Sequence, residues 1–264
     1  MTSDDLQHIR ASTGWRQHRT EVIRLAGGTV VVKGQRPARA AGGAGALSLL
    51  ASLTGLSLVK PAPAPGGTDG QAIEVGRLVA LRAAGLLAPQ VLHVDPEFFV
   101  MEFLAGPNMA QAMEDEPAQA LLLWQQGLQA LLALHAQGQY LSQAFARNFI
   151  LSPQGVAAID FEDDPVQAMP LLHAQARDWL LYLQSTVWLL PADTRPAAQA
   201  AWQDTIVTES SAVTAALRAA VGRLAWMRRL PSSRKPWGRD IISAQAAAAF
   251  LHAWARSSNT RQPS

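Results

Sequence analysis

The pattern of the chain changes once, near residues 101–108, and this change constrains the fold more than any other feature. Before it, residues 21–33 (EVIRLAGGTVVVK) place two β-branched runs on either side of a glycine pair. Such a run predicts a β-hairpin, because glycine accepts the positive φ of a tight turn. A helical pattern over residues 71–84 and extended runs at 91–94 and 98–101 follow. The first hundred residues therefore indicate a small sheet with one helix.

Beyond Pro117 the pattern is mainly helical. Apolar residues recur every three or four positions over residues 118–137, as expected for a buried helix. Two short strands are then predicted at 149–151 and 156–159. The remaining helices are predicted at 171–190, 196–221 and 241–256.

Length and composition agree with two parts that share a cleft. The 264 residues include 49% hydrophobic residues, which is enough to bury a sizeable core. We predict a sheet-rich part over residues 1–104, with an insert at 34–70, and a helical part over residues 105–264. A net charge of +2 gives no case for binding nucleic acid. The absence of cysteine excludes disulfides, thiolate metal ligands and cysteine nucleophiles.

Two segments bear on membrane contact. Residues 40–59 carry no charge, but their strongly apolar residues begin only after Ala46. We expect a short buried or interfacial helix there, not a membrane span. The basic stretch at 228–239 is expected to be a solvated face, and an anionic lipid surface is its alternative partner. The first ten residues are polar and do not have the pattern of a signal peptide.

Asn148 and Asp160 are the first candidate site residues. Each lies at an end of one of the two short strands near residues 149–159, so a hairpin of those strands brings them together. One amide oxygen and one carboxylate are hard oxygen ligands that suit Mg²⁺ bound to phosphates. The alternative is that Asp160 only ends a strand and Asn148 only caps a turn.

Three motifs in order resemble the catalytic core of aminoglycoside phosphotransferases and lipopolysaccharide core kinases. They are residues 134–138 (LHAQG), 149–151 (FIL) and 159–161 (IDF). These families belong to the protein-kinase-like superfamily, so the resemblance implies a bilobal fold with a small sheet-rich N-lobe and a larger helical C-lobe. It gives Asn148 and Asp160 the role of metal ligands. It also implies that Asp178 braces the catalytic loop, and an ordinary helix acid is the equal alternative there.

The N-terminal half carries further motifs of the same superfamily. Residues 30–33 (VVVK) resemble the strand whose lysine, here Lys33, binds the α- and β-phosphates of ATP, and Glu74 matches the glutamate that holds this lysine. Only three lysines occur in the chain, which argues against a chance surface position for Lys33. The resemblance places adenine against the main chain of Met101, Glu102 and Phe103. Met101 is equally compatible with a plain core position.

The chain departs from the family pattern at the catalytic acid. The family places an aspartate five residues before the metal-binding asparagine, and this chain has Gln143 there. Glutamine can hydrogen-bond an acceptor hydroxyl but cannot take its proton. Residues 162–164 (EDD) would assist a second metal or replace the missing base, or else form a solvated acidic turn, which is favoured for Asp163 and Asp164. His135 is expected to be a packed structural residue.

The expected function is therefore a kinase-like phosphotransferase with ATP and Mg²⁺ as cofactors. Its acceptor is a hydroxyl of a small molecule or of a glycolipid of the lipopolysaccharide type. The alternative is a pseudokinase, a nucleotide-binding module with little or no transfer, and nucleotide transfer is a third possibility. We expect a cytoplasmic protein, and peripheral attachment to the inner face of the membrane is left open by the basic stretch.

Overall fold

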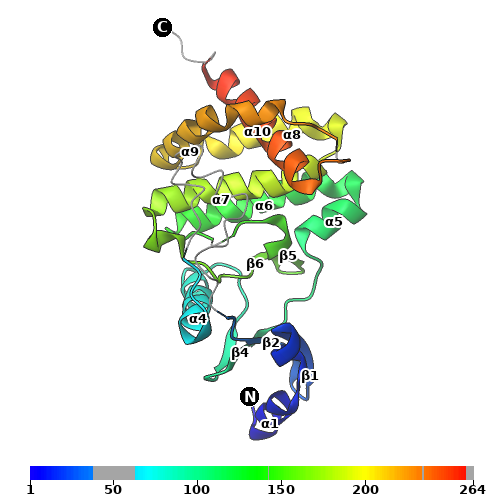
Figure 1. Ribbon diagram of the computed structural model, residues 1–264, viewed down its shortest axis with the longest axis vertical. Coiled ribbons are helices and arrows are strands. Elements are labelled where there is room, and N and C mark those ends of the chain that lie inside the picture. The colour runs from blue at the N-terminus through cyan, green and yellow to red at the C-terminus, as the bar shows by residue number, and fades with distance from the viewer. Residues whose placement is uncertain (38–62, 142, 234, 260–264) are drawn as a thin grey trace.

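The computed structural model describes residues 1–37, 63–141, 143–233 and 235–259, and its fold is α+β. The sheet lies at one end of the molecule and most of the helices lie at the other (Figure 1). The first part contains α1 (Ser3–Ala11), α2 (Gly14–His18), β1 (Thr20–Leu25), β2 (Gly28–Gly34), α4 (Gly67–Ala83), β3 (Val91–Val94) and β4 (Phe98–Glu102). The second part contains α5 (Met109–Asp115), α6 (Ala120–Ala136), β5 (Phe149–Ser152), β6 (Gly155–Ala158), α7 (Leu171–Thr186), α8 (Arg195–Ile206), α9 (Ser211–Leu224) and α10 (Arg239–Asn259).

The four strands of the first part form an antiparallel sheet in the order β1-β2-β4-β3. The predicted hairpin is confirmed as β1 and β2, with Thr20 opposite Lys33. Helix α4 begins earlier than predicted, at Gly67. Helices α1 and α2 were not expected from the sequence, and they carry Ile9 and Trp15 into a small core with the sheet. The Trp15 indole N–H donates to the carbonyl of Ile9, and this bond joins the two helices.

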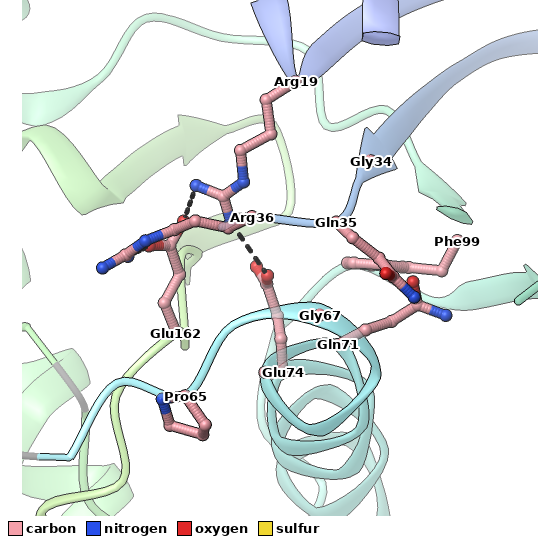
Figure 2. Close-up of a pocket in the computed structure, with 11 residues that line it drawn as sticks. Arg19, Gly34, Gln35, Arg36, Pro65, Gly67, Gln71, Glu74, Phe99 and Glu162 are labelled. Carbon is pink, nitrogen blue, oxygen red and sulfur yellow. Dashed lines mark hydrogen bonds and ion pairs between the residues drawn. The ribbon is translucent and has the colours of Figure 1, made fainter. Parts of the chain in front are cut away.

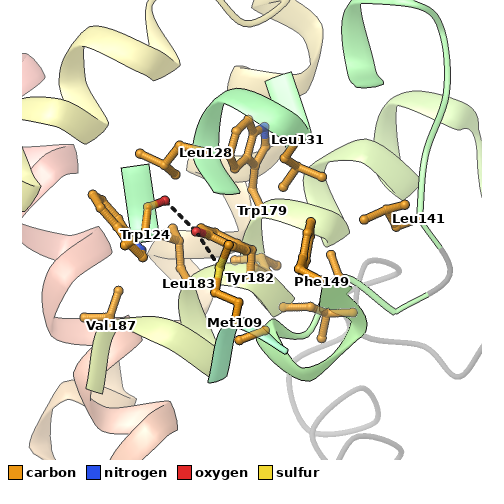
Figure 3. Close-up of a cluster of buried hydrophobic side chains, with 14 of the residues drawn as sticks. Met109, Trp124, Leu128, Leu131, Leu141, Phe149, Trp179, Tyr182, Leu183 and Val187 are labelled. Carbon is orange, nitrogen blue, oxygen red and sulfur yellow. Dashed lines mark hydrogen bonds between the residues drawn. The ribbon is translucent and has the colours of Figure 1, made fainter. Parts of the chain in front are cut away.

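The helices of the second part share a large apolar core (Figure 3). The Tyr182 hydroxyl lies at its centre and donates to the carbonyl of Trp124 at 2.6 Å. A Cβ at Gly127 would lie 2.2 Å from this hydroxyl, so the close approach of α6 and α7 requires glycine there. The single helix predicted over 196–221 is wrong, because the chain forms α8 and α9 instead. Ser210 ends the break, and its hydroxyl accepts from the N–H of Val213 as an N-cap.

The hairpin of β5 and β6 lies between the sheet and the helices, and it is confirmed as predicted (Figure 1). The connection from β4 to α5 passes against β5, since the N–H of Leu151 donates to the carbonyl of Pro107. Gly106 has φ 144°, and a Cβ there would lie 2.0 Å from the carbonyl oxygen of Leu151. The link between the two parts of the chain is therefore held tightly against this hairpin.

The membrane predictions have separate outcomes. Residues 40–59 lie outside the described residues. Within the described ranges, no helix has the length and apolar character needed to cross a bilayer. In the basic stretch, Arg229 and Lys235 are exposed, as expected for a solvated face.

Candidate active site

Lys33 is the centre of a buried charge cluster. Its side chain is only 7% exposed, and its Nζ lies 2.5 Å from Glu74 Oε1 and 2.8 Å from Asp160 Oδ1. A third carboxylate, that of Glu162, lies 3.4 Å away. Burial alone would lower the pKa of Lys33, but Glu74 and Asp160 outweigh it and raise this pKa, so the ammonium is charged. The predicted ion pair of Lys33 and Glu74 is thus present. The side chains of the whole cluster come from β2, α4 and the segment after β6.

Asp160 differs from the other two carboxylates in exposure. Its side chain is 30% exposed, whereas those of Glu74 and Glu162 are 3% and 9% exposed. Its backbone also has φ 69°, in the left-handed region that non-glycine residues seldom adopt. Such a conformation is retained where the surroundings impose it, often at functional sites. Of the three acids around Lys33, Asp160 is the most accessible to solvent.

Glu162 is bound by two arginines that the sequence analysis did not identify. Arg19 and Arg36 each contact its carboxylate, and Arg19 also lies 3.9 Å from Glu74 (Figure 2). Burial opposes ionisation of Glu162, but Lys33 and Arg19 prevail and lower its pKa to about 2. The register of the hairpin was the available signal for Arg19, because residue 19 directly precedes the position opposite Lys33.

The loop before β5 brings Gln143 and Asn148 together. The Asn148 amide nitrogen donates to the carbonyl of Gln143 at 2.9 Å, and the Gln143 amide nitrogen donates to Asp163 Oδ2 at 3.1 Å. The main-chain carbonyl of Asn148 accepts from the N–H of Ile159, so the predicted proximity of the segments carrying Asn148 and Asp160 is confirmed. That both side-chain oxygens bind one metal stays a prediction. Within the described ranges, no cluster of three or more histidine and acidic side chains could hold a metal ion.

The solvated acidic turn favoured for Asp163 and Asp164 is wrong for Asp163. Glu162 and Asp163 are both buried. Arg19 and Arg36 contact the Glu162 carboxylate, and the Gln143 amide donates to Asp163 Oδ2, so each of these buried acids has at least one polar partner. Asp164 is half-buried and accepts from the Tyr140 hydroxyl at 2.6 Å. This acidic run is therefore part of the structure around the site.

Asp178 and His135 belong to a buried hydrogen-bond network that holds the start of the same loop. Asp178 is fully buried, and its Oδ2 accepts from the N–H of Leu141 at 2.7 Å and contacts His135 Nε2 at 3.3 Å. The other nitrogen of His135 lies 2.6 Å from Glu209 Oε2, which also accepts from the Trp179 indole. Burial would lower the pKa of His135, but its two carboxylate partners raise it. Asp178 thus braces the loop, which was one of its two equal alternatives, and His135 is a packed structural residue, as expected.

The residues predicted to meet adenine lie at the end of β4. Met101 is 7% exposed and belongs to the main core, as its alternative assignment expected. Glu102 donates its N–H to the carbonyl of Gln90 at 2.8 Å. Phe103 is 39% exposed and follows the last residue of the strand. Contact of these residues with a nucleotide stays a prediction.

Comparison with known proteins assigns no family to this arrangement. Neither the models of known protein families nor the curated proteins include a match to the chain.

Proposed function

We propose that the chain has a bilobal protein-kinase-like fold and transfers phosphate from ATP, with Mg²⁺, to a hydroxyl of a small molecule or glycolipid. The observation that carries this proposal is the contact of Lys33 Nζ with both Glu74 and Asp160. A lysine held by a helix carboxylate suits the α- and β-phosphates, and an exposed aspartate beside it suits the metal that bridges the phosphates. Asn148 would supply the second metal ligand.

The arrangement of charge also supports an anionic ligand at this place. Lys33, Arg19 and Arg36 together offset Glu74, Asp160 and Glu162, so the cluster is formally neutral. A divalent metal at Asp160 would add two positive charges and leave an excess for the phosphates of a nucleotide. We infer that metal and nucleotide bind together, each weakly without the other.

A pseudokinase is the second candidate, and the hydrogen bond from Gln143 to Asp163 favours it. Position 143 carries no base, and its amide is engaged by a buried carboxylate. In this case the protein binds a nucleotide and metal but transfers little or no phosphate. Cytoplasmic location and contact with an anionic membrane remain part of the proposal for either candidate.

Nucleotide binding is tested by thermal unfolding with ATP, ADP and GTP, each with and without Mg²⁺. A ligand at about 100 times its Kd adds about 2.7 kcal/mol, or roughly 5–10 °C in Tm for a chain of this size. We expect a Mg²⁺-dependent shift with ATP that is lost in Lys33→Met and in Asp160→Asn. Asparagine tolerates the left-handed backbone at position 160. The matched control is Lys235→Met, which removes an exposed lysine.

Equal shifts in all four proteins, or none in the wild type, would contradict the proposed site. Mass spectrometry of hydroxyl acceptors incubated with ATP then separates the two candidates. A product heavier by one phosphate supports the phosphotransferase, and nucleotide binding without any product supports the pseudokinase.

A further inference from the structure

A cavity lies among the helices, and none of its lining residues belongs to the charge cluster around Lys33. Its volume is about 610 Å³, within the range of small-molecule sites. It is bounded by α5, α7, α9, α10 and the 3-10 helix Ala225–Arg229. Its walls are mainly apolar, and the apolar side chains that line it include Leu181, Leu189, Val221, Leu224, Met227 and Leu251.

Aromatic and basic side chains lie on the same lining. Trp226 is 47% exposed and so leaves apolar surface beside the cavity open to a ligand. Arg239 pairs with Glu114 at 3.3 Å, so these two charges offset each other. Arg147 lies over the ring of Phe145, 4.4 Å from its centroid. Among the described residues, no carboxylate lies within 4 Å of its guanidinium.

The cavity shares one loop with the candidate active site. Phe145, Ala146 and Arg147 line the cavity, and they lie between Gln143 and Asn148 in the chain. The N–H of Ala146 donates to the hydroxyl of Ser185, another lining residue, at 2.9 Å. Residues 145–147 of this loop therefore face the cavity, while Gln143 near its start donates a hydrogen bond to Asp163 in the candidate site. A molecule in the cavity would lie directly beside the loop.

We infer that this cavity binds the alkyl or acyl chain of an anionic amphiphile, whose phosphate or carboxylate contacts Arg147. The apolar walls suit a chain without polar groups, and the guanidinium suits a planar or tetrahedral anion. Asp240 also lines the cavity, so a cationic amphiphile is the competing ligand that the experiment must exclude. The inference does not depend on nucleotide binding.

The probes are n-octyl, n-decyl and n-dodecyl phosphate, each used as a monomer, with binding measured by titration calorimetry. We expect the affinity to rise about fourfold with each added methylene, as for burial of an alkyl chain. Dodecyltrimethylammonium is expected to bind at least tenfold more weakly than dodecyl phosphate. Equal binding of all chain lengths, or stronger binding of the cation, would overturn the inference.

Two variants locate the binding. Ala244→Trp fills the cavity from α10 and is expected to reduce dodecyl phosphate affinity more than tenfold. If this variant unfolds at a lower temperature than the wild type, Ala244→Leu replaces it. Arg147→Gln is expected to weaken dodecyl phosphate severalfold, while Arg24→Gln, which removes an exposed arginine of β1, leaves it unchanged. Wild-type affinity in the filled variants would refute the assignment.

Vesicles of phosphatidylglycerol distinguish a membrane surface from a monomeric ligand. Binding to vesicles but not to the monomeric phosphates would place the affinity on the protein surface and overturn the cavity assignment. Ala244→Trp is also expected to keep the thermal shift with ATP and Mg²⁺. Alkyl phosphate binding without any nucleotide binding would support this inference and contradict the proposed function. Nucleotide binding without alkyl phosphate binding would contradict this inference and leave the proposed function supported.

Discussion

Replacement of Gln143 by aspartate tests both the local structure and the chemistry of the loop. In the wild type the Gln143 amide donates to Asp163 at 3.1 Å, and Asp163 is 6% exposed. Gln143→Asp removes this donor and sets a second carboxylate beside a buried one. The substitution that restores the acid of the resembling enzymes is therefore expected to destabilise this protein.

The size of the effect follows from two contributions. Loss of a hydrogen bond to a charged acceptor costs about 1.5–3 kcal/mol. Two carboxylates about 4 Å apart repel by about 4 kcal/mol at an effective dielectric constant of about 20. Solvent reduces this repulsion because position 143 is only half-buried. We expect the free energy of unfolding to fall by about 3–5 kcal/mol near pH 7.

The loss should depend on pH. Repulsion raises the folded-state pKa of the new carboxyl, so its contribution to stability is present below its unfolded pKa of about 3.9 and is lost as the pH rises. Urea unfolding near pH 4 and pH 7 measures the difference. The double variant Gln143→Asp/Asp163→Asn is the matched control, because the amide then lies at position 163 and can donate to the carboxylate at 143. Wild-type stability of the single variant at both pH values would refute the reasoning.

The same double variant tests the chemistry, because it carries one carboxylate at position 143 without the repulsion. If transfer depends on a base, ATP turnover with an acceptor should rise by about 10²–10⁴-fold. A stable double variant with unchanged turnover would contradict a role for position 143 at the acceptor hydroxyl. A pseudokinase would show no turnover in either protein.

Three further outcomes are expected from urea unfolding. Lys33→Met leaves Glu74, which is 2% exposed as a whole residue, without its closest cation, and should lower the free energy of unfolding by about 3–5 kcal/mol. Lys33→Met/Glu74→Gln should recover part of this loss. Gly127→Ala should cost about 1–3 kcal/mol because of the 2.2 Å approach to the buried tyrosine hydroxyl, whereas the open Gly222→Ala should gain about 0.5–1 kcal/mol; equal effects would refute the packing argument. Because the folded-state pKa of His135 is raised, the stability that its protonation adds is fully present below about pH 6.5 and is lost as the pH rises through that pKa. The wild type should therefore lose more stability than His135→Gln between about pH 6 and pH 9. A parallel decline of the two proteins would contradict this.

The parts of the fold that were predictable have strong local signals. The hairpin of β1 and β2 follows from β-branched runs and a glycine turn, and α6 from its apolar period. The break between α8 and α9 has only the weak signal of the Ser210 cap, which a continuous helical pattern obscured. The polar helix α1 has too few apolar residues to reveal an amphipathic face.

The same distinction applies to the site. Lys33 lies in β2, Glu74 lies in α4 and Asp160 lies two residues after the end of β6, so their contacts follow from the topology of strand and helix. The contact between Gln143 and Asp163 joins two irregular segments, and their geometry depends on the whole surrounding core. Sequence patterning supplies no period for such segments, so the acidic run was mistaken for a surface turn.

The contact between Lys33 and Asp160 also has a consequence for how the protein folds. The two residues are 127 positions apart, and Lys33 and Glu74 are 41 positions apart, so both are long-range contacts that local structure formation does not bring together. Closing loops of this length costs conformational entropy before any ion pair can form. The contacts of Lys33 with Glu74 and Asp160 are therefore expected to form late in folding. A ligand bound there would therefore slow the separation of the sheet from the helices more than the fraying of any single helix. Hydrogen exchange at β2 and α4 with and without nucleotide would record this directly.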